Sequence, residues 1–144
     1  MKNINKIKSS IIMKFFSPFI VLICLISCLK KTSQDQYLEV FFLKEGLRSP
    51  MAINCNALQG SILDVNYKKI EDKKVFETFK EELKKLVNAK EQRDIDVRIQ
   101  VVYHDKKIVD TICMGAYFDI KVNGINKEDS KKLLKTIKDE IYKY

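Results

Sequence analysis

The sequence predicts an α+β fold: an antiparallel sheet of about four to five strands with two helices packed on one face, in the order ββαβββα. Segments of alternating apolar and polar residues are separated by short polar connections, which favours antiparallel pairing. Two other segments carry apolar residues at helical spacing, so each has one face to bury. Residues 37–144 suffice for one domain with a core, and not for two.

The first two strands are expected at residues 37–43 and 61–68. Residues 37–43 are rich in aromatic and aliphatic side chains that suit a strand. Residues 61–68 alternate with the period of a half-buried strand. The apolar members of that alternation are Leu63, Val65 and Tyr67. Residues 52–58 between the two strands fit no single element.

The period changes to that of a helix over residues 72–87. The apolar residues of this segment are Val75, Phe76, Phe79, Leu83, Leu86 and Val87. Asp72 is placed to cap the first turn. Glu81 and Lys85 are four residues apart, and we expect them to pair on the exposed face.

The clearest strand of the chain is residues 95–103, whose odd-numbered positions are all apolar or aromatic. A polar turn at residues 104–107 leads to a returning strand at 108–114. Placing Tyr103 opposite Ile108 gathers the apolar residues on one side of this hairpin. The same register puts Asp110 opposite Val101 on the apolar side, so Asp110 needs a hydrogen-bond donor or a place at the open end of the core.

A further strand is expected at residues 117–122, ended by a turn at Asn123 and Gly124. Its inward residues are Phe118, Ile120 and Val122. Asn126 then caps the last helix, with Asp129 in the capping-box position. The buried face of that helix consists of Leu133, Leu134, Ile137 and Ile141.

Half of the chain's net charge of +8 lies in its first 27 residues. Residues 1–27 hold four lysines and no acidic residue, which leaves 23 basic and 19 acidic residues in the remainder. Lysines and acids alternate on both predicted helices, and only three arginines are present. This pattern is typical of a solvated surface, and it argues against nucleic-acid binding, which needs a concentrated basic patch.

The amino-terminal segment is organised as a secretory signal. Lysines precede an apolar run at residues 15–26, which is shorter than the roughly 20 residues of a membrane-spanning helix. The tetrapeptide Leu25-Ile26-Ser27-Cys28 at the end of this run resembles the lipobox of bacterial lipoproteins. An alternative is an uncleaved amino-terminal anchor over residues 11–29.

The resemblance to lipoproteins implies a location and an attachment. Residues 1–27 would be a removed signal peptide, Cys28 would carry a diacylglyceryl thioether and an N-acyl chain, and residues 28–36 would form a tether. The single domain, residues 37–144, would be exported and anchored to the cell membrane or outer membrane, facing the periplasm or the exterior. No other cofactor is expected.

Two cysteines remain after the lipobox. In an exported domain Cys55 and Cys113 are candidates for a disulfide, and the alternative is two separately buried thiols. A metal site is not expected, because one histidine, His104 in the predicted turn, and two distant cysteines do not make a ligand set.

No catalytic motif is present, so an enzyme is the weaker hypothesis. Polar residues gather on the sheet face away from the helices, where they either form a solvated surface or bind a ligand. The candidates are Asp96, Arg98, Gln100, Thr111, Asp119 and Lys121.

The first functional hypothesis is a membrane-anchored interaction or accessory module, for example an inhibitor or immunity-like protein. We expect an envelope protein as its partner. The alternative is an envelope hydrolase or carbohydrate-binding protein that uses the carboxylates of the outer face. That alternative requires a concave cleft containing Asp96 or Asp119.

Overall fold

The computed structural model describes residues 35–142. The signal peptide, Cys28 and most of the tether lie outside the described residues. The described chain forms one six-stranded sheet in the order β2-β1-β3-β4-β5-β6, in which every neighbouring pair is antiparallel. The predicted α+β class is confirmed, with one strand more than expected. The strands are β1 (Gln36–Leu43), β2 (Val65–Ile70), β3 (Val97–Asp105), β4 (Ile108–Gly115), β5 (Ile120–Val122) and β6 (Ile125–Lys127).

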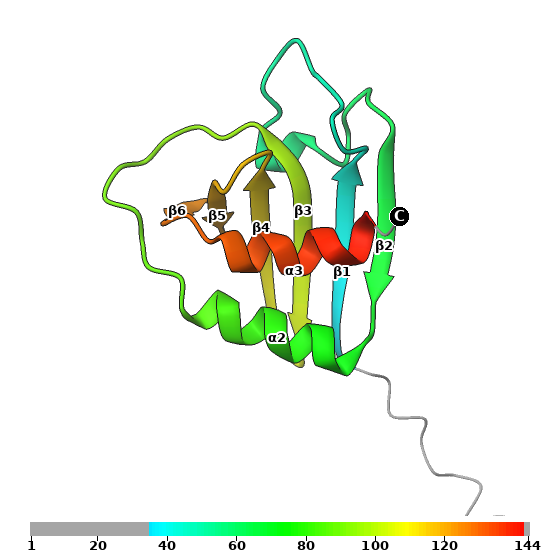
Figure 1. Ribbon diagram of the computed structural model, residues 1–144, viewed down its shortest axis with the longest axis vertical. Coiled ribbons are helices and arrows are strands. Elements are labelled where there is room, and N and C mark those ends of the chain that lie inside the picture. The colour runs from blue at the N-terminus through cyan, green and yellow to red at the C-terminus, as the bar shows by residue number, and fades with distance from the viewer. Residues whose placement is uncertain (1–34, 143–144) are drawn as a thin grey trace, which may run out of the picture. The chain divides into compact units, whose positions relative to one another are not determined.

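Two helices, α2 (Lys73–Lys84) and α3 (Lys131–Ile141), cover one face of this sheet (Figure 1). Their apolar stripes pack on the inward side chains of the central strands and form the main core. The helical members of this core are Phe76, Phe79, Leu133, Leu134 and Ile137. The helical spacing seen in the sequence therefore identified the buried faces, except at Val87, which lies beyond the end of α2 and is 60% exposed.

Helix α2 begins as predicted. The Asp72 side chain caps it by accepting hydrogen bonds from the backbone N–H groups of Lys74 and Val75. The helix ends at Lys84, earlier than expected, and Lys85 is its C-cap. From this position the Lys85 ammonium bonds Glu82 at 2.7 Å, so the expected pairing with Glu81 is wrong.

The β3–β4 hairpin has a register that differs by two residues from the predicted one. Tyr103 lies opposite Asp110, and the turn consists only of Lys106 and Lys107, the former with φ of 60°. Because the turn is shorter than expected, His104 and Asp105 remain in the strand. A shift of two residues preserves the faces, so the inward residues are still the predicted ones along most of the hairpin. Asp110 takes its donor from Asn123, whose Nδ2 lies 2.7 Å away.

A β-bulge interrupts β3 between Val97 and Ile99. The bulge turns Val97 and the preceding Ile95 toward the outer face of the sheet, where both are buried in a second, smaller cluster. The prediction that all odd positions of residues 95–103 face the helices is therefore wrong at its beginning. An alternating pattern does not reveal a bulge.

The outer strands also differ from prediction in their limits. β2 begins at Val65, four residues after the expected start, and Tyr67 is 53% exposed. β5 begins only at Ile120, and Phe118 lies in the bend before it, 37% exposed. The turn at Asn123 and Gly124 is confirmed, with φ of 49° and 83°, as a two-residue type I′ hairpin turn requires.

The predicted start of the last helix is wrong. Asn126 lies in β6, is 1% exposed, and donates its Nδ2 to the carbonyl of Arg93. Helix α3 begins at Lys131, and Ser130 caps it by accepting from the N–H of Leu133. Within residues 35–142, none of the helices has the length and apolarity that crossing a membrane requires.

Candidate functional site

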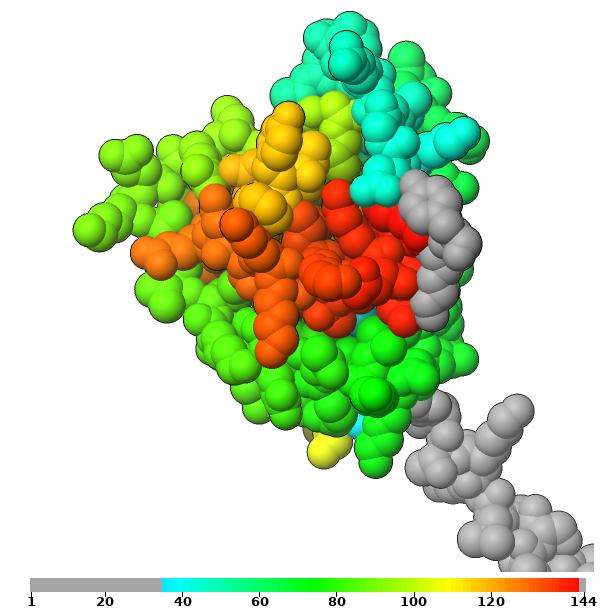
Figure 2. Space-filling model, in the orientation of Figure 1, coloured from blue at the N-terminus to red at the C-terminus, as the bar shows by residue number. Residues whose placement is uncertain are grey.

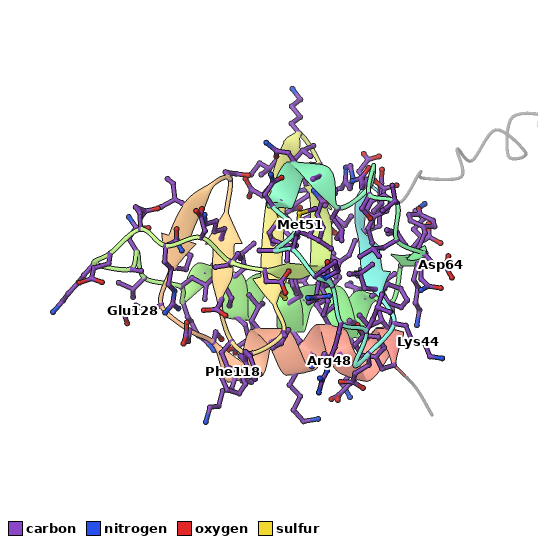
Figure 3. All side chains as sticks on the ribbon, turned by 90° about the horizontal axis from the view of Figure 1, so that it is seen from above. Lys44, Arg48, Met51, Asp64, Phe118 and Glu128 are labelled. Carbon is purple, nitrogen blue, oxygen red and sulfur yellow. A yellow bond between two sulfur atoms is a disulfide. The ribbon has the colours of Figure 1, made fainter. Side chains whose placement is uncertain are left out.

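The outer face of the sheet, opposite the helices, is partly covered by residues 44–64, which we call the cover segment. It connects β1 to β2 and contains a short 3₁₀ helix, η1 (Cys55–Ala57). Figure 3 shows η1 and α3 on opposite sides of the strands. The Asn54 side chain caps η1 by accepting from the N–H of Ala57 at 2.9 Å. Leu58 and Ile53 of the cover segment are buried against the sheet.

A disulfide between Cys55 and Cys113 joins η1 to β4. The two Cα atoms are 5.8 Å apart and the cysteines are 58 residues apart in sequence. Cys113 is fully buried. The predicted disulfide is thus present, and it joins the cover segment covalently to the outer face of the sheet.

Polar side chains of β3 and the residues before it hold the first half of the cover segment. Asp96 accepts a hydrogen bond from the N–H of Ile53 at 3.0 Å, and the N–H of Val97 donates to the carbonyl of Ile53 at 2.8 Å. Arg98 forms an ion pair with Asp96 and donates to the carbonyl of Leu47 at 3.0 Å. These bonds satisfy backbone groups that would otherwise be left without partners under the loop.

The side chain of Gln100 binds the second half of the cover segment. It is 6% exposed, donates to the carbonyl of Cys55 at 3.2 Å, and accepts from Gln59 at 2.9 Å. Three of the six predicted face residues, Asp96, Arg98 and Gln100, therefore bind the cover segment. An outward-facing position in a strand is not a solvated position where another part of the chain crosses it.

The other three predicted residues lie further along the sheet. The backbone N–H of Thr111 donates to Asn123 at 2.8 Å, and Lys121 lies 3.7 Å from the carboxylate of Asp94. Asp119, in the bend before β5, pairs with Arg93 at 3.0 Å. The structure brings Gln100, Thr111 and Lys121 to one cleft, and separates them from Asp96 and Arg98.

This cleft has a volume of about 780 Å³ and lies beside η1. Its polar lining consists of Asn54, Asn56, Asp94, Gln100, Thr111, Lys121 and Asn123. Amides, a hydroxyl, one carboxylate and one ammonium can hydrogen-bond a polar ligand or a protein backbone. Asp96 and Arg98 line a separate hollow of about 480 Å³ between the cover segment and α3.

The side chains that line these hollows can hydrogen-bond a polar ligand. Asp96 is engaged by Arg98 and by the Ile53 N–H, and a carboxylate paired in this way does not serve readily as a general acid or base. Within residues 35–142 no group of three or more His, Cys, Asp or Glu side chains is arranged to hold a metal ion. His104 lies in β3 instead of a turn, stacks on Tyr37, and has its Nε2 2.9 Å from Glu39.

A polar network missed by the sequence reasoning lies at the other end of β3. The carboxylate of Asp105 accepts from Lys80 at 2.6 Å, from Gln36 at 2.7 Å and from the Tyr103 hydroxyl at 3.0 Å. The Lys80 ammonium, followed by the Gln36 amide, lowers the pKa of Asp105 to about 2. Burial, followed by the bond to Asp105, raises the pKa of Tyr103. The residues of this network come from three elements, β1, α2 and β3, so no local sequence motif predicts it.

Comparisons with protein-family models, curated proteins and solved structures found no match for this chain.

Proposed function

We propose that this chain is an exported bacterial lipoprotein whose domain acts as a small interaction module at the envelope. Cys28 would carry diacylglyceryl and N-acyl chains on the cell membrane or outer membrane, and the domain would face the periplasm or the exterior. The anchoring part rests on the lipobox sequence, residues 25–28.

The single observation that supports export most strongly is the disulfide between Cys55 and Cys113. Structural disulfides persist in oxidising compartments and are rare in the cytosol, where thiols are kept reduced. The signal-like pattern at the amino terminus and the disulfide in the domain are independent features that support the same compartment.

The interaction role is supported by how the polar residues are used. Asp96, Arg98 and Gln100 bind the cover segment, and the cleft beside η1 is a polar hollow of the outer face with side chains available to a partner. Its amide-rich lining suits recognition of a polypeptide or another hydrogen-bonding partner. We expect an envelope protein as that partner.

Crosslinking in intact cells tests the proposal. The wild-type protein should fractionate with membranes and crosslink to one specific envelope protein through the cleft. Asn56→Arg places a long charged side chain in the cleft and should abolish that crosslink. Glu81→Arg, an equally exposed change on α2, should leave it intact.

The anchor is tested by growing cells with a labelled fatty acid, which should be incorporated into the wild-type protein and not into the Cys28→Ser variant. A wild-type protein that takes up no label would contradict lipid anchoring. A crosslink that survives Asn56→Arg would contradict the assignment of the cleft as the binding site.

A further inference from the structure

One end of the domain combines lysines with exposed apolar side chains. Lys106 and Lys107 form the β3–β4 turn, and Ile108 and Val109 follow at the start of β4. All four are exposed; the fractions for Ile108 and Val109 are 56% and 57%. We call residues 106–109 the basic turn. Within residues 35–142 neither lysine has an ion-pair partner.

The basic turn lies where the chain enters the domain. The backbone N–H of Lys106 donates to the carbonyl of Asp35 at 2.8 Å, and Gln36 pairs with Asp105 in the sheet. Figure 1 shows this turn at the same end of the sheet as the beginning of β1, and the small group of yellow atoms at the lower edge of the coloured surface in Figure 2 belongs to this end of the β3–β4 hairpin. Asp35 is seven residues after Cys28, so at most about 25 Å of extended chain separates them.

A shallow hollow of about 450 Å³ opens beside the turn, lined by Lys80, Asp105, Lys106, Lys107 and Ile108. The only carboxylate in this lining, that of Asp105, is already bonded to Lys80, Gln36 and the Tyr103 hydroxyl. Lys106 and Lys107 are therefore not paired with a carboxylate of this hollow, and their charge complements an anionic group such as a phosphate diester.

We propose that the basic turn lies against an anionic lipid bilayer, with Lys106 and Lys107 at the headgroup phosphates and Ile108 and Val109 in the interfacial layer. This inference rests on the proposed lipid anchor, because a lipid on Cys28 would hold the turn within reach of the surface. Lysines near an anionic membrane and apolar side chains at the interface act together in this geometry. The domain would then stand with the cover segment directed away from the membrane, leaving the cleft open to a partner.

The opposite end of the domain provides an internal reference. Met51 in the cover segment is 76% exposed, and Lys44 is an exposed lysine of the same region (Figure 3). The cover segment is remote from the beginning of β1 (Figure 1). A membrane that contacts the basic turn should leave Lys44 accessible.

Lysine footprinting on the native acylated protein tests the inference. The protein is placed in vesicles of phosphatidylglycerol and phosphatidylcholine, in vesicles of phosphatidylcholine alone, and in detergent, and each lysine is acetylated and quantified by mass spectrometry. We expect acetylation of Lys106 and Lys107 to be about tenfold slower on the anionic vesicles, and the protection to weaken in high salt. Lys44 should react at the same rate in all three conditions.

Substitutions of apolar residues test whether Ile108 and Val109 contribute to the membrane contact. Ile108→Ser combined with Val109→Ser should reduce the protection of both lysines, while Met51→Ser at the opposite end should not. Inorganic phosphate added to the detergent sample should give no protection. Protection by phosphate alone would assign the hollow to a free anion and overturn the membrane contact.

The two proposals fail in different ways. Equal acetylation of Lys106 and Lys107 in all three conditions, on protein whose Cys28 peptide carries acyl chains, would overturn the membrane contact and leave the anchor in place. Native protein whose amino-terminal peptide carries no acyl chains would overturn the anchor itself.

Discussion

The two faces of the sheet are buried by different means. The inner face is covered by α2 and α3, and its core contains 14 buried residues. The outer face is covered by a loop, and its cluster contains six. Apolar burial is the main stabilising contribution in folding, and the outer face has far less of it than the inner face. The cover segment therefore depends on a disulfide and on hydrogen bonds to its backbone.

This difference explains which face carries the polar cleft. Helices pair their own backbone N–H and C=O groups in hydrogen bonds, and each presents a continuous apolar stripe. They therefore cover the inner face with apolar side chains. A loop exposes peptide groups that need partners, and the polar side chains of β3 supply them. The hollow beside η1 lies where this cover ends.

The largest effect should come from the inner face. Phe79 is fully buried between α2 and the sheet, and it contacts Tyr103 with ring centroids 6.1 Å apart. Phe79→Ala should lower the free energy of unfolding by about 3–5 kcal/mol in urea denaturation. Val87→Ala, at a position that is 60% exposed, should change it by less than about 0.5 kcal/mol. Equal losses from both variants would show that the helical cover is not the main core.

The disulfide should give the next largest effect. Replacing both cysteines by alanine should cost about 4 kcal/mol, because the unfolded chain regains the freedom of a loop spanning 58 residues. Amide hydrogen exchange should accelerate first in the cover segment and later in β3. If the cover segment kept its protection without the disulfide, its hydrogen bonds alone would suffice to hold it.

The Asp105 network predicts a defined acid dependence. The pKa of Asp105 is about 2 in the folded state, below the ordinary value of 3.8, so its stabilisation is complete above about pH 4 and is lost as the pH falls through 2. Asp105→Asn should lower stability at pH 7 by about 1–3 kcal/mol. The difference between variant and wild type should shrink below pH 4 when unfolding is followed by circular dichroism. A difference that grew on acidification would contradict the network.

The smallest effect should come from a single hydrogen-bonding side chain under the loop. Arg98→Ala removes the bond to the Leu47 carbonyl and the partner of Asp96, and should cost about 1 kcal/mol. Hydrogen exchange should rise in the cover segment and not in α3. Lys135→Ala, which removes an exposed ion pair with Asp139 on α3, should cost less than about 0.5 kcal/mol and serves as the control.

The same contrast explains what the sequence allowed us to predict. Helical spacing identified both helices of the inner face, and alternation identified β1, β3 and β4, because these patterns are local. The register of the β3–β4 hairpin was wrong because the turn has only Lys106 and Lys107, and a shift of two residues leaves the pattern of faces unchanged. Asn126 was predicted to cap the last helix because it precedes a helical pattern and Asp129 follows three residues later. The sequence does not show that Asn126 is instead buried in the short strand β6.

The outer face was harder to predict for a physical reason. Gln100 bonds residues 41 and 45 positions away, and nothing in the neighbouring sequence indicates such partners. The pairing of Cys55 with Cys113 could be named as a candidate only because two cysteines remain after the lipobox. The candidate residues were identified as a polar face, whereas the division of that face by the cover segment required the three-dimensional structure.

We propose that this domain works as an exported, lipid-anchored protein whose two domain cysteines are oxidised. One measurement tests it directly: the intact mass of native protein alkylated without reduction, with fragmentation of its amino terminus. We predict a chain that begins at an acylated Cys28 and shows no alkylation of Cys55 or Cys113. A chain that begins at Met1, lacks acyl groups and carries alkylated thiols at both positions would contradict the account.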